Sequence, residues 1–94
     1  MQNPKISIIV PMYNVEQYLD TFISSCKGQT ERDFEMIIVD DGSTDESLNL
    51  AKKYASEDVR IKVFHKENGG VSSARNLALK NANGRYLVFW DPDY

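Results

Sequence analysis

The sequence is poor in the features that mark secreted, zinc-binding and membrane-spanning proteins. Its single cysteine, Cys26, cannot form a disulfide within the chain. Its single histidine, His65, has no second histidine or cysteine nearby, so a zinc site is not expected. No apolar run reaches the roughly 18 residues of a membrane span, and residues 1–5 lack the pattern of a signal peptide. These absences favour a cytoplasmic protein without a membrane span.

Positive charge is also scarce. The 94 residues include 11 Lys and Arg against 14 Asp and Glu, which gives a formal net charge of −3. This balance does not supply the basic face that nucleic acids and anionic lipids require, so we expect no nucleic-acid partner. It still allows one nucleotide to bind through backbone amides and a metal ion. The length indicates a single domain over residues 1–94, because domains usually contain about 100–150 residues.

Apolar periodicity predicts strands that alternate with helices in the order β-α-β-α-β-α-β. The expected strands are short segments at residues 5–10, 34–39, 60–64 and 85–90. Between them, apolar residues recur at helical spacing, as in the stripe from Val15 to Cys26, which makes Cys26 an inert core residue. This alternation implies an α/β fold with an open, mostly parallel sheet and helices on both faces. The third strand alternates polar and apolar residues and is the expected edge strand.

Local sequence signals mark the expected helix ends. Asn14 precedes the first helix and can cap it, and Ser43 with Glu46 has the spacing of a capping box. Gly28 and Gly84 stand where the glycines that end helices are found. We therefore expect side chains close in sequence to cap the first two helices.

Polar side chains gather where the expected strands end, and in open α/β sheets ligands bind at this edge. The segments there are residues 11–14, 40–45, 65–70 and 91–93, which contain five aspartates, two asparagines and two adjacent glycines. Three of these segments lead into helix N-termini, which attract phosphates. A divalent cation such as Mg²⁺ or Mn²⁺ reconciles the carboxylates with phosphate, because it binds oxygens of both. The edge therefore predicts a metal–phosphate site.

Each segment also has a purely structural interpretation. Asp-Asp-Gly-Ser at residues 40–43 and Asn-Gly-Gly at residues 68–70 are good turn sequences. Tyr13 is of a type that usually packs, and His65 is expected at the surface of a strand end. Arg75 is more informative, because a helix N-terminus disfavours a cation unless an anion binds there. The functional interpretation rests on all the segments meeting at one edge.

Four segments, in order, resemble the N-terminal nucleotide-binding half of family 2 glycosyltransferases of the GT-A fold. They are KISIIVPMYNVEQYL from residue 5, DFEMIIVDDGSTDES from residue 33, NGGVSSARNLAL from residue 68 and GRYLVFWDPD from residue 84. The resemblance implies the Rossmann-like half of a GT-A fold. It also implies transfer of a sugar, with inversion at the anomeric carbon, from a nucleotide diphosphate-sugar donor that is usually UDP-linked.

The resemblance further implies which residues bind the base of the nucleotide. Tyr13 would stack on the base, and Pro11 would lie in the backbone wall of the same pocket. Asp41 would bind the edge of the base, with Asp40 as its support.

The other two motifs imply contacts with the ribose, the diphosphate and a metal. Gly69, Gly70 and Arg75 would lie beside the ribose and the diphosphate. Asp91 and Asp93 form an Asp-x-Asp motif that would reach the ribose and a divalent metal, Mn²⁺ or Mg²⁺, with Asp93 as its direct ligand. The metal and fixed N–H donors would stabilise the charge of the diphosphate leaving group.

The end of the sequence departs from the family pattern. Tyr94 stands where many members have a further acidic residue, and Pro92 restricts Asp91 to extended backbone. The family's catalytic base lies in the acceptor-binding half, which would follow Tyr94, so no catalytic residue is assigned in this chain. We expect a truncated fragment that binds the donor and does not transfer sugar alone. The acceptor of the full enzyme would be a glycan or a lipid-linked hydroxyl.

Alternatives from other functional classes remain open. One alternative is a noncatalytic nucleotide-binding or oligomerisation fragment. Truncation would leave an edge strand of its sheet uncovered, and such a strand favours a homodimer. A phosphoryl-transfer domain of receiver or haloacid-dehalogenase type would place acidic residues after the first strand, where this chain has Pro11 to Asn14. A dinucleotide-binding fold is disfavoured, because Gly-x-Gly-x-x-Gly does not follow the first strand. The association with polysaccharide or glycan synthesis is by family analogy only.

Overall fold

Strands and helices alternate along the chain, as the apolar periodicity predicts. The computed structural model describes residues 4–28 and 33–90. The elements in chain order are β1 (Ile6–Met12), α1 (Glu16–Lys27), β2 (Phe34–Asp41), α2 (Ser47–Glu57), β3 (Ile61–Lys66), α3 (Val71–Lys80) and β4 (Tyr86–Phe89).

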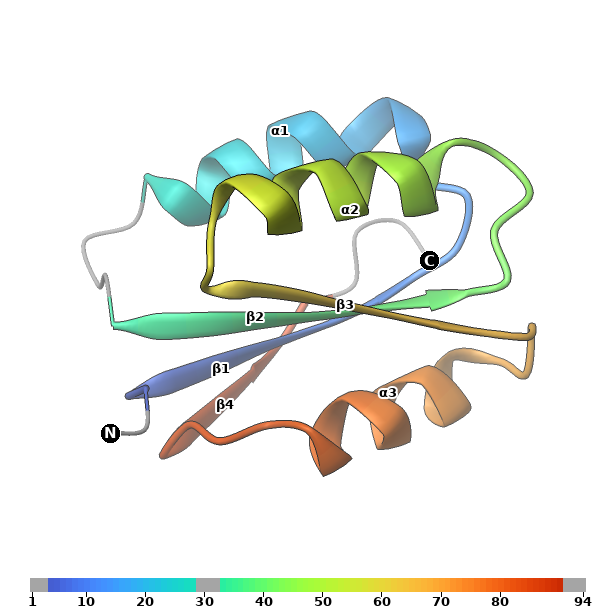
Figure 1. Ribbon diagram of the computed structural model, residues 1–94. Helices are drawn as coiled ribbons and strands as arrows, with labels where there is room; N and C mark the ends of the chain where they lie inside the picture. Colours follow the sequence, from blue (N-terminus) through green and yellow to red (C-terminus); the bar gives the residue numbers. More distant parts are fainter. Residues whose placement is uncertain (1–3, 29–32, 91–94) are drawn as a thin grey trace.

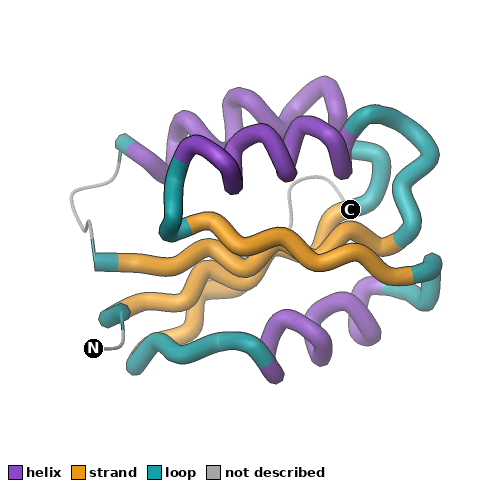
Figure 2. Tube along the Cα trace, viewed as in Figure 1, coloured by secondary structure: helices purple, strands orange, loops and turns teal. Residues whose placement is uncertain are grey.

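The strands form one parallel sheet in the order β3-β2-β1-β4. The chain begins in β1, moves outward to β3, and then crosses to the other side of β1. Since crossovers between parallel strands are right-handed, this reversal places α1 and α2 on one face of the sheet and α3 on the other. Figures 1 and 2 show this three-layer arrangement. The expected α/β architecture is confirmed, and so is the position of β3 at an edge.

Both faces of the central strands are covered, which explains their long apolar runs. The larger core cluster lies beneath α1 and α2 and contains Leu19, Phe22 and Ile23 of α1. A smaller cluster beneath α3 consists of Ile9, Ile37, Val39, Ala74 and Ala78. Cys26 is fully buried in the larger cluster, and burial raises the pKa of its thiol to about 11, as suits an inert core residue. Tyr18, expected on the same apolar stripe, is half exposed.

β1 continues past Pro11, where the sequence predicted its end. Pro11 pairs with Val39 of β2, while the pairing of β1 with β4 ends at Ile9. The Ile9 carbonyl accepts the Trp90 N–H, so every second residue of β1, including Pro11, turns its backbone toward the β4 side. The missing N–H of Pro11 therefore costs no ladder hydrogen bond within the described part of the sheet.

A buried carboxylate organises the amino-terminal edge of the sheet. Glu35 is 3% exposed and accepts hydrogen bonds from the Ser7 hydroxyl (2.6 Å), the Asn83 N–H (2.5 Å) and the Lys62 ammonium (3.0 Å). Ser7 Oγ in turn accepts the Gly84 N–H at 2.7 Å. We call Ser7, Glu35, Lys62, Asn83 and Gly84 the amino-edge cluster. It ties the turn between α3 and β4 to the central strands.

Gly84 was expected to end the third helix, and that prediction is wrong. α3 ends at Lys80, with Asn81 as its C-cap. Gly84 lies against β1 instead, where an added Cβ would stand 2.6 Å from the Ser7 backbone nitrogen. Only a residue without a side chain fits this approach of two backbones.

Candidate functional site

Three loops meet at the carboxyl edge of the sheet because β1, β2 and β3 are neighbours that run in the same direction. β1 ends at Met12, β2 at Asp41 and β3 at Lys66, and each strand leads through a short loop into a helix. The loops lie together at the same end of the sheet in Figure 1. The predicted convergence of these segments is therefore confirmed.

Side chains that follow β2 cap α1, and the loops after β1 and β2 are bonded to each other. At the start of α1, the Val15 N–H donates to Ser47 Oγ at 2.8 Å, and the Glu16 N–H donates to an Asp45 carboxylate oxygen at 3.2 Å. In return, Asn14 Oδ1 accepts the Thr44 N–H at 2.8 Å. The two loops thus form one hydrogen-bonded unit at the edge of the sheet.

This reciprocal arrangement corrects the local capping that the sequence predicted. Asn14 has a φ of 53° and does not cap α1, whose N-cap is Val15. The Ser43–Glu46 capping box is absent, since α2 begins at Ser47 and Glu46 makes no side-chain capping bond. α1 is capped by Ser47 and Asp45 because both helix N-termini lie at the same sheet edge. At the start of α2, the Ser47 N–H donates to Asp45 Oδ1 of its own loop at 2.9 Å.

Asp40 is a fully buried carboxylate in the next-to-last position of β2. Its Oδ2 atom accepts the Ser43 N–H at 3.2 Å and lies 2.9 Å from Nδ1 of His65, its partner in the register of β3. Its Oδ1 atom has no hydrogen-bond partner among the described residues. Asp40 therefore shapes the loop after β2 from within.

Asp41 ends β2 and is also fully buried. Lys66 Nζ donates to its Oδ1 atom at 2.8 Å, and so does the Gly69 N–H at 2.9 Å. The Gly70 N–H donates to Oδ2 at 3.0 Å. Gly70 is the N-cap of α3, so Asp41 occupies the place of an anion at this helix N-terminus. The N–H groups of both glycines are thus already bonded to a carboxylate of the chain.

Gly42 brings the loops after β2 and β3 into contact. Its φ is +76°, and an added Cβ would lie 2.7 Å from the backbone nitrogen of Asn68. Both the left-handed backbone and the close approach require glycine here. The turn after Asp41 therefore fits directly against the loop that Asp41 holds.

The residues expected beside the base lie at the same edge. Pro11 is buried near the end of β1, and Tyr13 follows the strand in a half-buried position. The structure thus brings Pro11, Tyr13, Asp40, Asp41, Gly69 and Gly70 to one end of the sheet.

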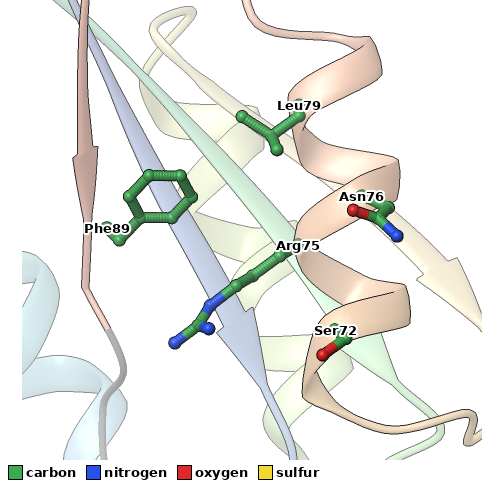
Figure 3. Close-up of a pocket in the computed structure, with 5 residues that line it drawn as sticks. All are labelled: Ser72, Arg75, Asn76, Leu79 and Phe89. Atoms are coloured by element: carbon green, nitrogen blue, oxygen red, sulfur yellow. The ribbon is translucent and has the colours of Figure 1, made fainter.

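Arg75 belongs to a pocket on the other face of the sheet. The pocket has a volume of about 420 Å³, lies between α3 and β4, and is lined by Ser72, Arg75, Asn76, Leu79 and Phe89 (Figure 3). The Arg75 guanidinium carbon stands 5.9 Å from the centre of the Phe89 ring, within cation–π distance. Arg75 lies on α3, and Gly70, the N-cap of this helix, donates its N–H to Asp41.

The predicted metal ligands, Asp91 and Asp93, lie outside the described residues. Across residues 4–28 and 33–90, no group of three or more His, Cys, Asp or Glu side chains is arranged to hold a metal ion. The described carboxylates of the edge are bonded instead to N–H groups, a lysine and a histidine.

Sequence reasoning missed His65 and Lys66 as partners of the site. His65 was expected at the surface, and it is half exposed, but its pairing with Asp40 was not foreseen. Both residues end β3 and stand opposite Asp40 and Asp41 in the strand register. Aligning the ends of the two predicted strands would have indicated both pairs.

Comparison with known proteins identifies the family. The sequence model of Glycosyl transferase family 2 matches residues 7–94. The chain belongs to this family. Among curated relatives, the uncharacterized glycosyltransferase EpsJ of Bacillus subtilis is 51% identical over 90 residues, which are 96% of this chain and 26% of EpsJ. The cholesterol galactosyltransferase of Borreliella burgdorferi is 42% identical over 95% of this chain and 25% of its own length.

Solved structures of glycosyltransferases share the fold. Staphylococcus aureus TarS in complex with UDP-GlcNAc matches with a TM-score of 0.86 and 40% identity, over 95% of this chain and 26% of TarS. The mannosyltransferase PcManGT of Pyrobaculum calidifontis, in complex with GDP-Man and Mn²⁺, matches with a TM-score of 0.77 and 27% identity over 99% and 28% of the two chains. The GT-A fold is thereby confirmed. The chain spans about a quarter of the length of these relatives.

None of the described helices combines the length and apolar character needed to cross a lipid bilayer.

Proposed function

We propose that this chain is the donor-binding part of an inverting glycosyltransferase, which takes a sugar from a nucleotide diphosphate-sugar, UDP-linked in the first instance. The observation that carries the proposal is the buried Asp40–Asp41 pair at the carboxyl edge, in a chain that the family model matches over residues 7–94. The neighbours solved with UDP-GlcNAc and GDP-Man support a nucleotide-sugar as the ligand.

The proposed base site uses residues of β1 and β2. Tyr13 stacks on the base, and Pro11 forms part of the pocket wall. Asp41 accepts a hydrogen bond from the edge of the base, and Asp40 supports Asp41 from within. Support comes from the placement of all four residues at one edge.

The proposed diphosphate and metal sites lie toward α3 and the end of β4. Gly69 and Gly70 shape the wall beside the ribose, and Arg75 faces the diphosphate. Asp91 and Asp93 hold Mn²⁺ or Mg²⁺, as the Mn²⁺ complex of PcManGT suggests by analogy. A metal bound there would supply positive charge to the leaving diphosphate.

The acceptor site and the catalytic base then lie in parts of the enzyme other than these 94 residues, because the chain spans about a quarter of the length of its relatives. The acceptor is a glycan or a lipid-linked hydroxyl in polysaccharide or glycan synthesis at the cytoplasmic side. The chain alone binds the donor and does not transfer sugar.

Calorimetric titration of the chain with UDP, with and without Mn²⁺, tests the proposal. We expect binding that strengthens with Mn²⁺ and an Asp93→Ala variant that loses only the metal-dependent part. A matched titration with GDP shows which base is preferred. A chain that binds neither nucleotide at millimolar concentration, or that transfers sugar unaided, would contradict the proposal.

A second candidate, a noncatalytic oligomerisation fragment, is favoured by β4. Within residues 4–28 and 33–90, this strand pairs only with β1, and its Tyr86, Leu87, Val88 and Phe89 residues are 41–57% exposed. Such an edge favours pairing with a second copy. Sedimentation would then detect a homodimer in the wild type and a monomer in Val88→Lys. A wild type that stays monomeric at high concentration would rule this candidate out.

A further inference from the structure

Lys66 is a residue of the carboxyl edge to which neither the family resemblance nor the comparisons give a role. Its side chain is 19% exposed, and its ammonium lies 2.8 Å from Asp41 Oδ1 and 2.6 Å from the carbonyl oxygen of Glu67. It stands opposite Asp41 in the register of β2 and β3. Lys66 thus contacts both the buried carboxylate and the start of the loop that leads to α3.

A buried carboxylate needs compensation, because removing a charge from water costs several kcal/mol unless it is paired and hydrogen-bonded. Asp41 receives one formal positive charge from Lys66 and two N–H groups from Gly69 and Gly70. The lysine is thereby a charged part of the arrangement that holds Asp41 in place.

The fit around Gly69 shows how closely Lys66 is built into the loop. An added Cβ on Gly69 would lie 2.8 Å from Lys66 Nζ and 3.3 Å from Ser73 Oγ. The lysine therefore passes directly over the glycine whose N–H binds the same Asp41 oxygen. The two donors to Asp41 Oδ1 are therefore close neighbours.

The same contacts reach α3. Gly70 is the N-cap of α3, and its carbonyl accepts the Ala74 N–H at 3.2 Å. Arg75 is the next residue along the helix. A carboxylate held by Lys66 therefore fixes the N-terminus of the helix that carries Arg75, so one arrangement positions both proposed contact points of the nucleotide.

We infer that Lys66 is a positioning residue of the donor site, one that holds Asp41 and the 67–70 loop in the geometry that binds the nucleotide base. This inference rests on the proposed function. It predicts that loss of the Lys66 charge weakens nucleotide binding by more than it changes global stability.

Lys62 offers a matched control on the same strand. Its ammonium lies 3.0 Å from Glu35, a second buried carboxylate of β2, but at the opposite end of the sheet. Lys66→Met and Lys62→Met therefore remove the same chemical group from two similar pairs. Lys66→Arg keeps the charge, and Lys66→Gln serves as a milder neutral variant if the methionine variant does not fold.

The test uses the full chain, with UDP and GDP titrations and amide hydrogen exchange measured by NMR. In Lys66→Met we expect nucleotide dissociation constants about tenfold higher and exchange of the Gly69 and Gly70 amides about tenfold faster relative to global exchange. Lys62→Met should change neither quantity, and Lys66→Arg should restore most of both. The arginine rescue separates a charge that positions Asp41 from simple packing.

Three outcomes count against the inference and are distinguishable. Unchanged exchange at Gly69 and Gly70 in Lys66→Met would overturn the positioning of the loop. Faster exchange with unchanged dissociation constants would overturn its link to the donor, while the proposed function stands. A wild type that binds neither UDP nor GDP would reject the proposed function itself, and the inference with it.

Discussion

The two ends of β2 carry similar chemistry in different settings. Glu35 at the amino end and Asp41 at the carboxyl end are both buried, and each pairs with a lysine of β3. At the amino end, the donors to Glu35 come from a central strand and a tight turn, whereas at the carboxyl end Asp41 receives bonds from the loop that begins α3. Of these two carboxylate–lysine pairs, only Asp41–Lys66 bonds to a loop at the edge where we propose that the donor binds.

The lysines of the two pairs differ in how far their side chains are exposed. The side chain of Lys62 is 44% exposed, and it reaches Glu35 from the surface. The side chain of Lys66 is 19% exposed and enclosed by its own loop. Removal of Lys62 leaves Glu35 with the Ser7 and Asn83 donors. Removal of Lys66 takes from Asp41 the ammonium that lies 2.8 Å from its Oδ1 atom, and the bonds from the Gly69 and Gly70 amides stay. The amino-edge cluster is therefore expected to support stability, and the carboxyl edge to support binding.

We expect the largest effect, a loss of stability, in Glu35→Ala. The variant leaves the Ser7 hydroxyl and the Asn83 N–H without their acceptor, which should lower the free energy of unfolding by about 3 kcal/mol. Urea denaturation measures the loss. Lys62→Met removes a partly exposed ammonium and should lower the free energy of unfolding by less than about 1 kcal/mol. UDP affinity of the folded protein should be unchanged. A parallel loss of affinity would erase the difference between the two ends.

Two glycines sharpen the comparison with a smaller effect. In Gly84→Ala the new Cβ would meet the Ser7 backbone, and in Gly42→Ala it would meet the Asn68 backbone at a φ of +76°. Each variant should lose about 2 kcal/mol of stability from crowding or backbone strain. Only Gly42→Ala should also weaken UDP binding, because it displaces the loop that Asp41 holds. Equal affinities of the two folded variants, measured by calorimetry, would count against this assignment.

Much of the fold could be predicted because its determinants are local. The apolar runs of β1 and β2 and the alternation in β3 follow directly from burial on two faces or one. The helix ends were less predictable, since Val15 and Glu16 are capped by Ser47 and Asp45 from another loop. Local capping rules consider side chains near in sequence, and these are about 30 residues away.

The candidate site was predictable in its location and less so in its contacts. Strand direction alone brings Tyr13, Asp41 and Gly70 to one edge. The pairs Asp40–His65 and Asp41–Lys66 depend on the register between β2 and β3, which periodicity alone does not specify and which an alignment of the two strand ends indicates. Sequence reasoning did not single out Glu35 within its apolar strand, although a buried charge in such a strand requires partners.

The smallest expected effect is on the acid stability of the two ends. Burial raises the pKa of Glu35, but the hydrogen bonds from Ser7, Asn83 and Lys62 outweigh it and lower that pKa below its ordinary value. In the same way, burial raises the pKa of Asp45 at the carboxyl edge, and the bonds from Ser47 and Glu16 lower it overall. Because folding lowers both pKa values, both carboxylates add stability that is present at neutral pH. That stability is lost as the pH falls below about 4 and through the folded-state pKa values.

Urea denaturation between pH 7 and pH 3 separates the two contributions. Glu35→Gln should flatten the decline of the unfolding free energy toward low pH, since the variant has no carboxylate to protonate there. Asp45→Asn should flatten it less, because the Asp45 side chain is only partly buried and its ionised form loses less when its bonds are broken. If Asp45→Asn instead has the larger effect, the bonds that Asp45 accepts from Glu16 and Ser47, and not the amino-edge cluster, limit the stability of this fold in acid.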